Sequence, residues 1–207
     1  MPKSSNEARI IDCIKINQLN LSRFLQDFQH STSLFELLER GGGPPNVGVF
    51  GGVFINYRII AAKDAAMNLY HFRCSLDAII KQSKFVPSLV PSASMQSLSD
   101  QLSLFDSKFP HTVTIRHGVA HAGELYNTPI KISAATQTKR QKAHGVETGR
   151  EGMLICTLFE RTFTIGKEGS GKEGEIFSMQ VDNSTTSVLA SITHSVNSIF
   201  ASLPQRT

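Results

Sequence analysis

The chain has 207 residues, of which 40% are hydrophobic and 18% charged, with no tryptophan and a formal net charge of +4. This length is enough for one domain with its own apolar core, and the composition is that of an ordinary globular protein. A charge this small does not by itself indicate a nucleic-acid-binding protein. The most apolar stretch, VGVFGGVFINYRIIAA, is interrupted by Asn56 and Arg58, so it falls short of a membrane span.

The cysteines and the N-terminus indicate a reduced, cytoplasmic protein. Cys13, Cys74 and Cys156 are odd in number, widely spaced and contain no C-x-x-C pair, which argues against a disulfide framework or a zinc ribbon. The first residues, MPKSSNEARIIDC, lack the apolar core of a signal peptide. We therefore expect no association with a membrane.

Helical spacing of apolar residues dominates the first half of the chain. It predicts two short amphipathic helices in an N-terminal extension over residues 1–45, marked by Leu21, Phe24, Leu25 and Phe28 and then by Leu34, Leu37 and Leu38. A longer helix follows from near Asn56 to about Ser83, and Pro87 and Pro91 end it. The stretch SASMQSLSDQLSLFD predicts another helix.

The next segment, FPHTVTIRHGVAHAGEL, has Pro110 placed for a first helical turn. A helix is favoured here, although the β-branched residues at 112–115 leave a strand open. Residues 46–125 would then form the core of a bundle.

The rest of the chain predicts a basic loop at 126–150, a β-hairpin at 151–182 and a final helix at 183–204. The strand-forming stretches MLICTLFERTFTI and EIFSMQV flank the glycine-rich GKEGSGKEG, and Asp182, Asn183 and Ser184 offer caps for the helix. The expected architecture is a single, mainly α domain over 1–207, a helical bundle with a β-hairpin inserted before its last helix.

The predicted loop carries the whole charge excess of the protein. The stretch from Tyr126 to Arg150 contains five basic residues and one acidic residue, Glu147, which gives it a net charge of +4. Such a segment suits contact with RNA phosphates, and a solvated surface loop is the alternative. The candidate RNA-binding residues are Lys131, Lys139, Arg140 and Lys142.

Two short motifs resemble known sites, but each lacks one residue that the site requires. GKEGSGKE resembles a phosphate-binding P-loop, but Glu173 replaces the required Ser or Thr, and its flanks predict two strands. HGVAH has the histidine spacing of a zinc protease, but Gly118 replaces the glutamate that would act as general base. A simpler metal site built from His117, His121 and Glu124 stays open.

Arg116 and His121 together suit phosphodiester cleavage. A guanidinium offers forked donors to a phosphate, and an imidazole exchanges a proton near neutral pH. In RNA the neighbouring 2′-hydroxyl can be the attacking group, so this chemistry requires no metal ion and no cofactor.

The stretch IRHGVAHAGE resembles the signature of the HEPN superfamily, an arginine followed by a polar residue and then by a histidine near the start of a bundle helix. Arg116, His117 and His121 match these positions. The resemblance covers about residues 50–125 and the last helix, and it implies a HEPN-like helical bundle that forms a homodimer. It also implies a metal-independent endoribonuclease of a toxin–antitoxin or phage-defence system, with Arg116 on the phosphate, His121 as acid and base and His117 as orienting residue.

Two alternatives remain beside this one. Some HEPN domains have lost catalysis and bind a protein antitoxin or regulatory partner, and the metal site above would make a hydrolase. His71, near Arg73 and Asp77 in the long helix, could support the motif from a facing helix or be an ordinary surface histidine. Arg23 and His30 are also spaced like the motif, but Phe24 follows the arginine where a polar residue is expected.

Overall fold

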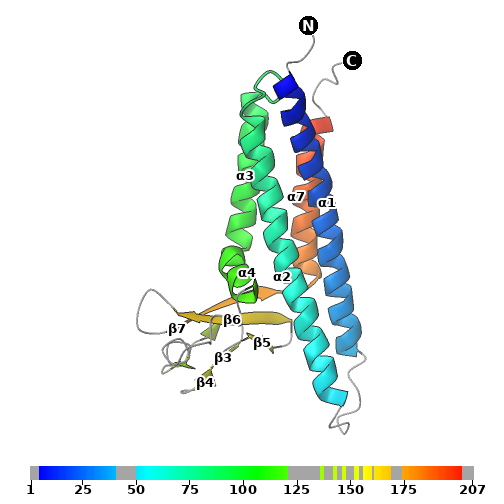
Figure 1. The fold of residues 1–207 in the computed structure, drawn as a ribbon. Helices are drawn as coiled ribbons and strands as arrows, with labels where there is room; N and C mark the ends of the chain where they lie inside the picture. Colours follow the sequence, from blue (N-terminus) through cyan, green and yellow to red (C-terminus); the bar gives the residue numbers. More distant parts are fainter. Residues whose placement is uncertain are drawn as a thin grey trace. The chain divides into compact units, whose positions relative to one another are not determined.

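The structure is a computed structural model that describes residues 5–40, 50–120, 136–137, 142–143, 146–147, 152–153, 156–159, 161–168 and 174–201. Within these residues the chain is mainly helical, with a small antiparallel sheet before the last helix (Figure 1). The mainly α class predicted from the sequence is confirmed. The helices are α1 (Ser5–Arg40), α2 (Phe50–Ser83), α3 (Ser92–Lys108), α4 (Thr112–Ala120) and α7 (Asn183–Ala201).

The chain divides into two compact units, each made of segments far apart in the sequence. Unit 1 contains residues up to 29, 68–110 and those from 184 onward, and unit 2 contains 30–67 and 111–183. The helices α1 and α2 contribute to both units. The single domain expected over 1–207 stays a prediction.

Unit 1 packs parts of α1 and α2 with α3 and α7 around one apolar core (Figure 1). Its buried side chains recur every seven residues along each helix, as in Leu69 and Leu76, or Phe72 and Ile79, all at most 1% exposed. This is the period at which neighbouring helices keep one apolar face toward each other. The Phe72 and Phe105 rings stack at 5.8 Å between centroids and join α2 to α3.

The prediction of two short helices at the start of the chain is wrong, because α1 is one helix of 36 residues. No glycine or proline occurs between Ser5 and Arg40, so nothing in the sequence breaks it. Its buried seam runs through the boundary that the prediction placed between two helices: Ile14, Leu21, Phe28 and Phe35 are each at most 2% exposed.

The other helices fall close to their predicted places. The helix α2 begins at Phe50, earlier than expected, and ends at Ser83 as expected. A helix at α4 is confirmed over the strand alternative. The final helix is described from Asn183 to Ala201.

Unit 2 contains the strands. The strands β5 (Cys156–Phe159), β6 (Thr162–Glu168) and β7 (Gly174–Gln180) form an antiparallel sheet in the order β5-β6-β7. Phe163 pairs with Met179, and both are buried, which gives the sheet an apolar face. Four short strands make two further pairs: β1 (Thr136–Gln137) with β4 (Gly152–Met153), and β2 (Lys142–Ala143) with β3 (Val146–Glu147).

Two features of this region differ from the sequence prediction. The stretch expected as the first hairpin strand forms both β5 and β6, since Phe159 pairs with Thr162 across a two-residue connection. The stretch expected as a loop at 126–150 contains β1, β2 and β3. Strands of two residues are too short to leave a periodic pattern in a sequence, which explains the second difference.

No helix in the described part of the chain is long and apolar enough to span a membrane.

The described core predicts that a buried phenylalanine contributes much more to the free energy of unfolding than an exposed one. Phe72 is 0% exposed and Phe85 is 69% exposed. We expect Phe72→Ala to lower the free energy of unfolding by about 3–5 kcal/mol because it opens a cavity, and Phe85→Ala to change it by about 0.5 kcal/mol or less. Urea denaturation of both variants measures this, and equal losses would contradict the described core.

Candidate functional site

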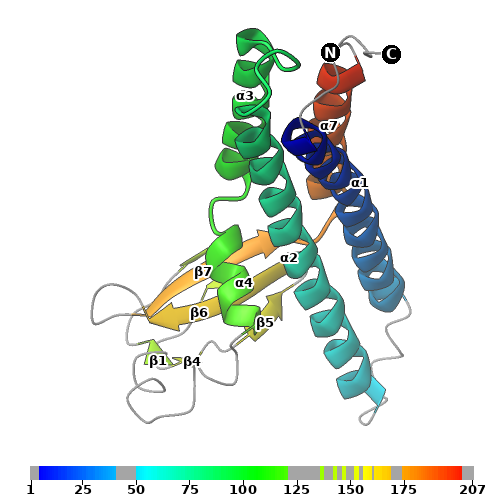
Figure 2. The same ribbon diagram turned by 45° about the horizontal axis from the view of Figure 1, so that its top comes forward.

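The helix α4 carries Arg116 and His117 of the motif and lies against β6 and β7 (Figure 2). Its buried residues, Thr112, Ile115 and Gly118, recur every three positions and so share one face of the helix. Gly118 therefore lies on the buried face, where the absence of a side chain lets the α4 backbone approach its neighbours closely. This packing is a structural reason for a glycine that otherwise weakens a helix.

The first turn of α4 is fixed by its neighbours. The amide of Ile115 donates to the carbonyl of His111 at 2.9 Å. The His111 ring meets the Phe177 ring of β7 edge to face, with centroids 5.2 Å apart. His111 thus helps to hold α4 on the sheet.

Arg116 and His117 follow the buried Ile115 on α4. Arg116 is half-buried, with its Nε atom buried, and His117 is exposed. Successive residues of a helix are separated by about 100° around its axis, so Arg116 lies beside the buried face and His117 lies on the outer side. A half-buried guanidinium acts in a lower effective dielectric than one fully in water, which strengthens its attraction for an anion.

The remaining predicted site residues are only partly placed. His121 lies outside the described residues, as do Lys131, Lys139 and Arg140. Lys142 lies in β2. The arrangement of the motif with the basic segment therefore stays a prediction.

Other sequence candidates receive an ordinary structural role or stay open. His71 belongs to unit 1, where its ring stacks on Phe24 at 5.3 Å between centroids. The segment that resembles a P-loop, residues 166–173, begins inside β6 and ends just before β7, so it joins two strands where a P-loop joins a strand to a helix. The described residues contain no group of three potential metal ligands, but His121 and Glu124 lie outside them.

Sequence reasoning missed a charged cluster in unit 2, made of Glu36, Glu39, Arg58 and Arg161. Arg161 follows β5 and donates to Glu36 Oε1 at 3.0 Å and to Glu39 Oε2 at 3.1 Å. Arg58 lies 3.8 Å from Glu39 and over the Phe35 ring at 4.7 Å. These residues are up to 125 positions apart, so no local pattern could have joined them.

The cluster favours the charged form of Arg161. Desolvation lowers the pKa of Arg161, but the nearby carboxylates of Glu39 and then Glu36 outweigh it and leave the pKa raised. Asn183, at the start of α7, also donates to Glu36 at 3.1 Å. The cluster thus ties the strand connection and the start of α7 to the end of α1.

A scan against protein-family models and searches of curated proteins and of solved structures find no match to this chain.

The cluster predicts a salt-sensitive contribution to stability. We expect Arg161→Gln to lower the free energy of unfolding by about 1 kcal/mol, because the Arg161 side chain is 39% exposed and solvent screens its pairs with Glu36 and Glu39. The loss should shrink at about 1 M salt, where the screening length falls to roughly 3 Å. Thermal unfolding at low and high salt measures both effects.

Arg23 provides the matched control, because its pair with Asp27 is 3.7 Å long and its side chain is 75% exposed. Arg23→Gln should leave stability nearly unchanged. If the two variants behave alike, the Arg161 contacts are not a structural tie.

Proposed function

We propose that this protein is a metal-independent endoribonuclease of the HEPN type. Arg116 contacts the scissile phosphate, His121 transfers protons and His117 orients the reacting group. The observation that supports this best is the position of Arg116 and His117 on α4. One face of the helix is packed in the protein, and beside it Arg116 is half-buried and His117 is exposed.

The chemistry follows from these side chains. His121 takes the proton from the 2′-hydroxyl, whose oxygen attacks the adjacent phosphorus, and Arg116 stabilises the charge on the phosphorane oxygens. The bond to the 5′-oxygen breaks, and a proton donor completes the 5′-hydroxyl. A second copy of the chain would supply that donor, since base and acid are both needed in one turnover. The products are a 2′,3′-cyclic phosphate and a 5′-hydroxyl end.

The mainly helical fold is the class that the proposal requires, and the basic residues after the motif add an attraction for RNA. Lys131, Lys139, Arg140 and Lys142 would contact phosphates, which makes binding depend on salt. The chain departs from the expected all-helical packing in one respect, because α4 lies against a sheet.

The proposal predicts RNA cleavage that depends on the motif. In EDTA, the wild type should cleave a mixed RNA pool and leave 2′,3′-cyclic phosphate and 5′-hydroxyl ends. Arg116→Ala and His121→Ala should each lower the rate at least about a hundredfold, the scale of a lost general acid–base or charge-stabilising group. End-group analysis and single-turnover rates measure this.

The second arginine–histidine pair of the chain is the matched control. Arg23 and His30 are both exposed on α1, so Arg23→Ala and His30→Ala should cleave like the wild type. A folded wild type that leaves RNA intact, or equal cleavage by all variants, would reject the ribonuclease. Cleavage lost in EDTA and restored by zinc would favour the metal-dependent alternative.

A non-catalytic, homodimeric interaction protein is the second candidate, and an exposed apolar patch on α1 and α2 favours it. The patch consists of Leu34 (46% exposed), Leu37 (68%), Tyr57 (52%) and Ile60 (57%). Contiguous apolar patches are uncommon on monomers and often mark interfaces.

One contact joins the two helices next to these residues. Ser31 donates to Asp64 at 2.5 Å. Leu34 and Ile60 lie about one helical turn from these two residues, toward the end of α1, and Leu37 and Tyr57 lie about one turn further. The four exposed residues therefore belong to the same stretch of the α1–α2 pair.

The patch predicts a dimer that a single charge disrupts. We expect Leu37→Arg to weaken self-association at least about tenfold, because truncating or charging a buried interface anchor costs more than about 1.4 kcal/mol. Sedimentation equilibrium measures the dissociation constant. Phe85→Arg, at a residue of equal exposure in unit 1, should leave it unchanged. A monomeric wild type, or an unaffected Leu37→Arg dimer, would contradict this assignment of the patch.

A further inference from the structure

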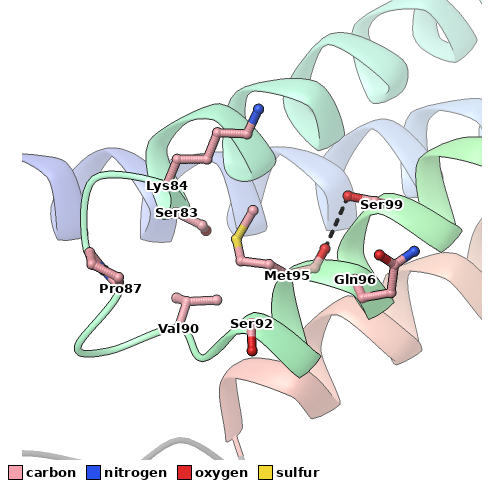
Figure 3. A pocket seen from close by; sticks show the side chains of 8 residues that line it. All are labelled: Ser83, Lys84, Pro87, Val90, Ser92, Met95, Gln96 and Ser99. Carbon is pink, nitrogen blue, oxygen red and sulfur yellow. Dashed lines mark hydrogen bonds between the residues drawn. The ribbon is translucent and has the colours of Figure 1, made fainter.

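The corner between α2 and α3 holds a pocket of about 370 Å³ (Figure 3). Backbone hydrogen bonds hold its walls in place: Val86 donates to Ser83 at 3.2 Å, Val90 to Val86 at 3.0 Å and Met95 to Pro91 at 3.0 Å. Val86 and Val90 are each 1% exposed and anchor the corner in the core of unit 1. The segment that bounds the pocket is therefore held in place by its own backbone hydrogen bonds.

Ser83, which lines this pocket, has a hydroxyl that the protein leaves unsatisfied. The residue is 0% exposed, and its Oγ has no hydrogen-bond partner among the described residues. The hydroxyl of a serine in a helix can donate to the carbonyl four residues earlier, as that of Ser99 does to Met95 at 3.0 Å. The Ser83 hydroxyl makes no such hydrogen bond. Burying a hydroxyl without a hydrogen-bond partner is unfavourable, so we expect the Ser83 hydroxyl to have a partner from outside the chain.

The start of α3 borders the same pocket and presents donors of its own. Pro91 occupies the N-cap position and makes no side-chain cap, and no acidic residue lies in the first turn. The first amides of a helix lack intrahelical acceptors, and the helix dipole makes this end attractive to anions. Ser92, the first residue of α3, lines the pocket.

The charge of the pocket wall agrees with an anionic ligand. Lys84 is the one charged residue among those that line it, and no carboxylate does. The side-chain amide of Gln96 already donates to the Asp100 carboxylate at 2.9 Å. The wall therefore offers the Lys84 ammonium, the Ser83 and Ser92 hydroxyls and the end of a helix.

We propose that this pocket binds a small organic anion with a carboxylate or phosphate head and a short apolar body. The head lies between the start of α3, Lys84 and Ser83, and the body lies against Val90 and Met95. The Met95 side chain points toward Ser83 (Figure 3). Because methionine is flexible, a change of its rotamer gives the head access to the buried hydroxyl. The volume is near the lower end of roughly 300–1,000 Å³ that small-molecule sites occupy.

The test uses n-butyl phosphate and butyrate as probes, with inorganic phosphate as the bare head. Amide NMR shifts of the full chain are followed during each titration. We expect saturable shifts at residues 92–94 with at least one of the two organic probes, and the tighter of the two identifies the head group. Ser83→Ala should weaken that binding about tenfold, the effect of one hydrogen bond to a charged group, and Lys84→Gln should weaken it severalfold.

Lys81 is the matched control for Lys84, because it lies about one helical turn before Lys84, on α2, and pairs with Asp77 at 2.6 Å. Lys81→Gln should bind like the wild type. Without ligand, Ser83→Ala should unfold at a higher temperature than the wild type, because it removes an unsatisfied buried hydroxyl, and this shows that the variant is folded. No saturation by either organic probe, unchanged binding by Ser83→Ala, or equal losses in the two lysine variants would overturn the proposal. None of these readouts depends on RNA cleavage.

Discussion

Burial of apolar side chains at seven-residue intervals along α1 and α2 is the constraint on which the other elements depend. In α1 the seam passes through Ile14, Leu21, Phe28 and Phe35. In α2 it passes through two series, Ala62, Leu69 and Leu76, and Ala65, Phe72 and Ile79. A seven-residue repeat is slightly shorter than two helical turns, which span about 7.2 residues, so helices that keep such faces together must coil gently around each other. Most of the stability of helices in proteins comes from packing of an apolar face, and the seam supplies that packing here.

The character of the seam changes along α2. Its buried residues in unit 1 are mainly leucine, isoleucine and phenylalanine, whereas in unit 2 they are Ala61, Ala62, Ala65 and Ala66. Alanine contributes little apolar area, so unit 2 relies more on polar contacts. The Ser31–Asp64 hydrogen bond and the pairs of Arg161 with Glu36 and Glu39 provide them. These polar contacts act beside the buried apolar residues Phe163 and Met179 of the sheet.

The motif helix depends on that sheet. The helix α4 is too short to be stable by itself, and its buried face and the His111–Phe177 contact hold it in place. A glycine at position 118 weakens the helix intrinsically but suits a buried position. The placement of Arg116 beside the buried face and of His117 on the outer side thus follows from packing rather than from helix propensity.

The sequence by itself determined the mainly helical class, the end of α2 at Ser83, the helix at α4 and the strand-forming stretches before α7, because each rests on local periodicity, prolines or β-branched residues. It also supplied the motif of Arg116, His117 and His121, since these residues lie within six positions. Tertiary structure alone decided that α1 is continuous, that one stretch forms both β5 and β6, that Arg161 meets Glu36 and that the Ser83 hydroxyl is buried without a partner. These features depend on contacts or on burial that distant residues create, and local sequence patterns carry no signal for either.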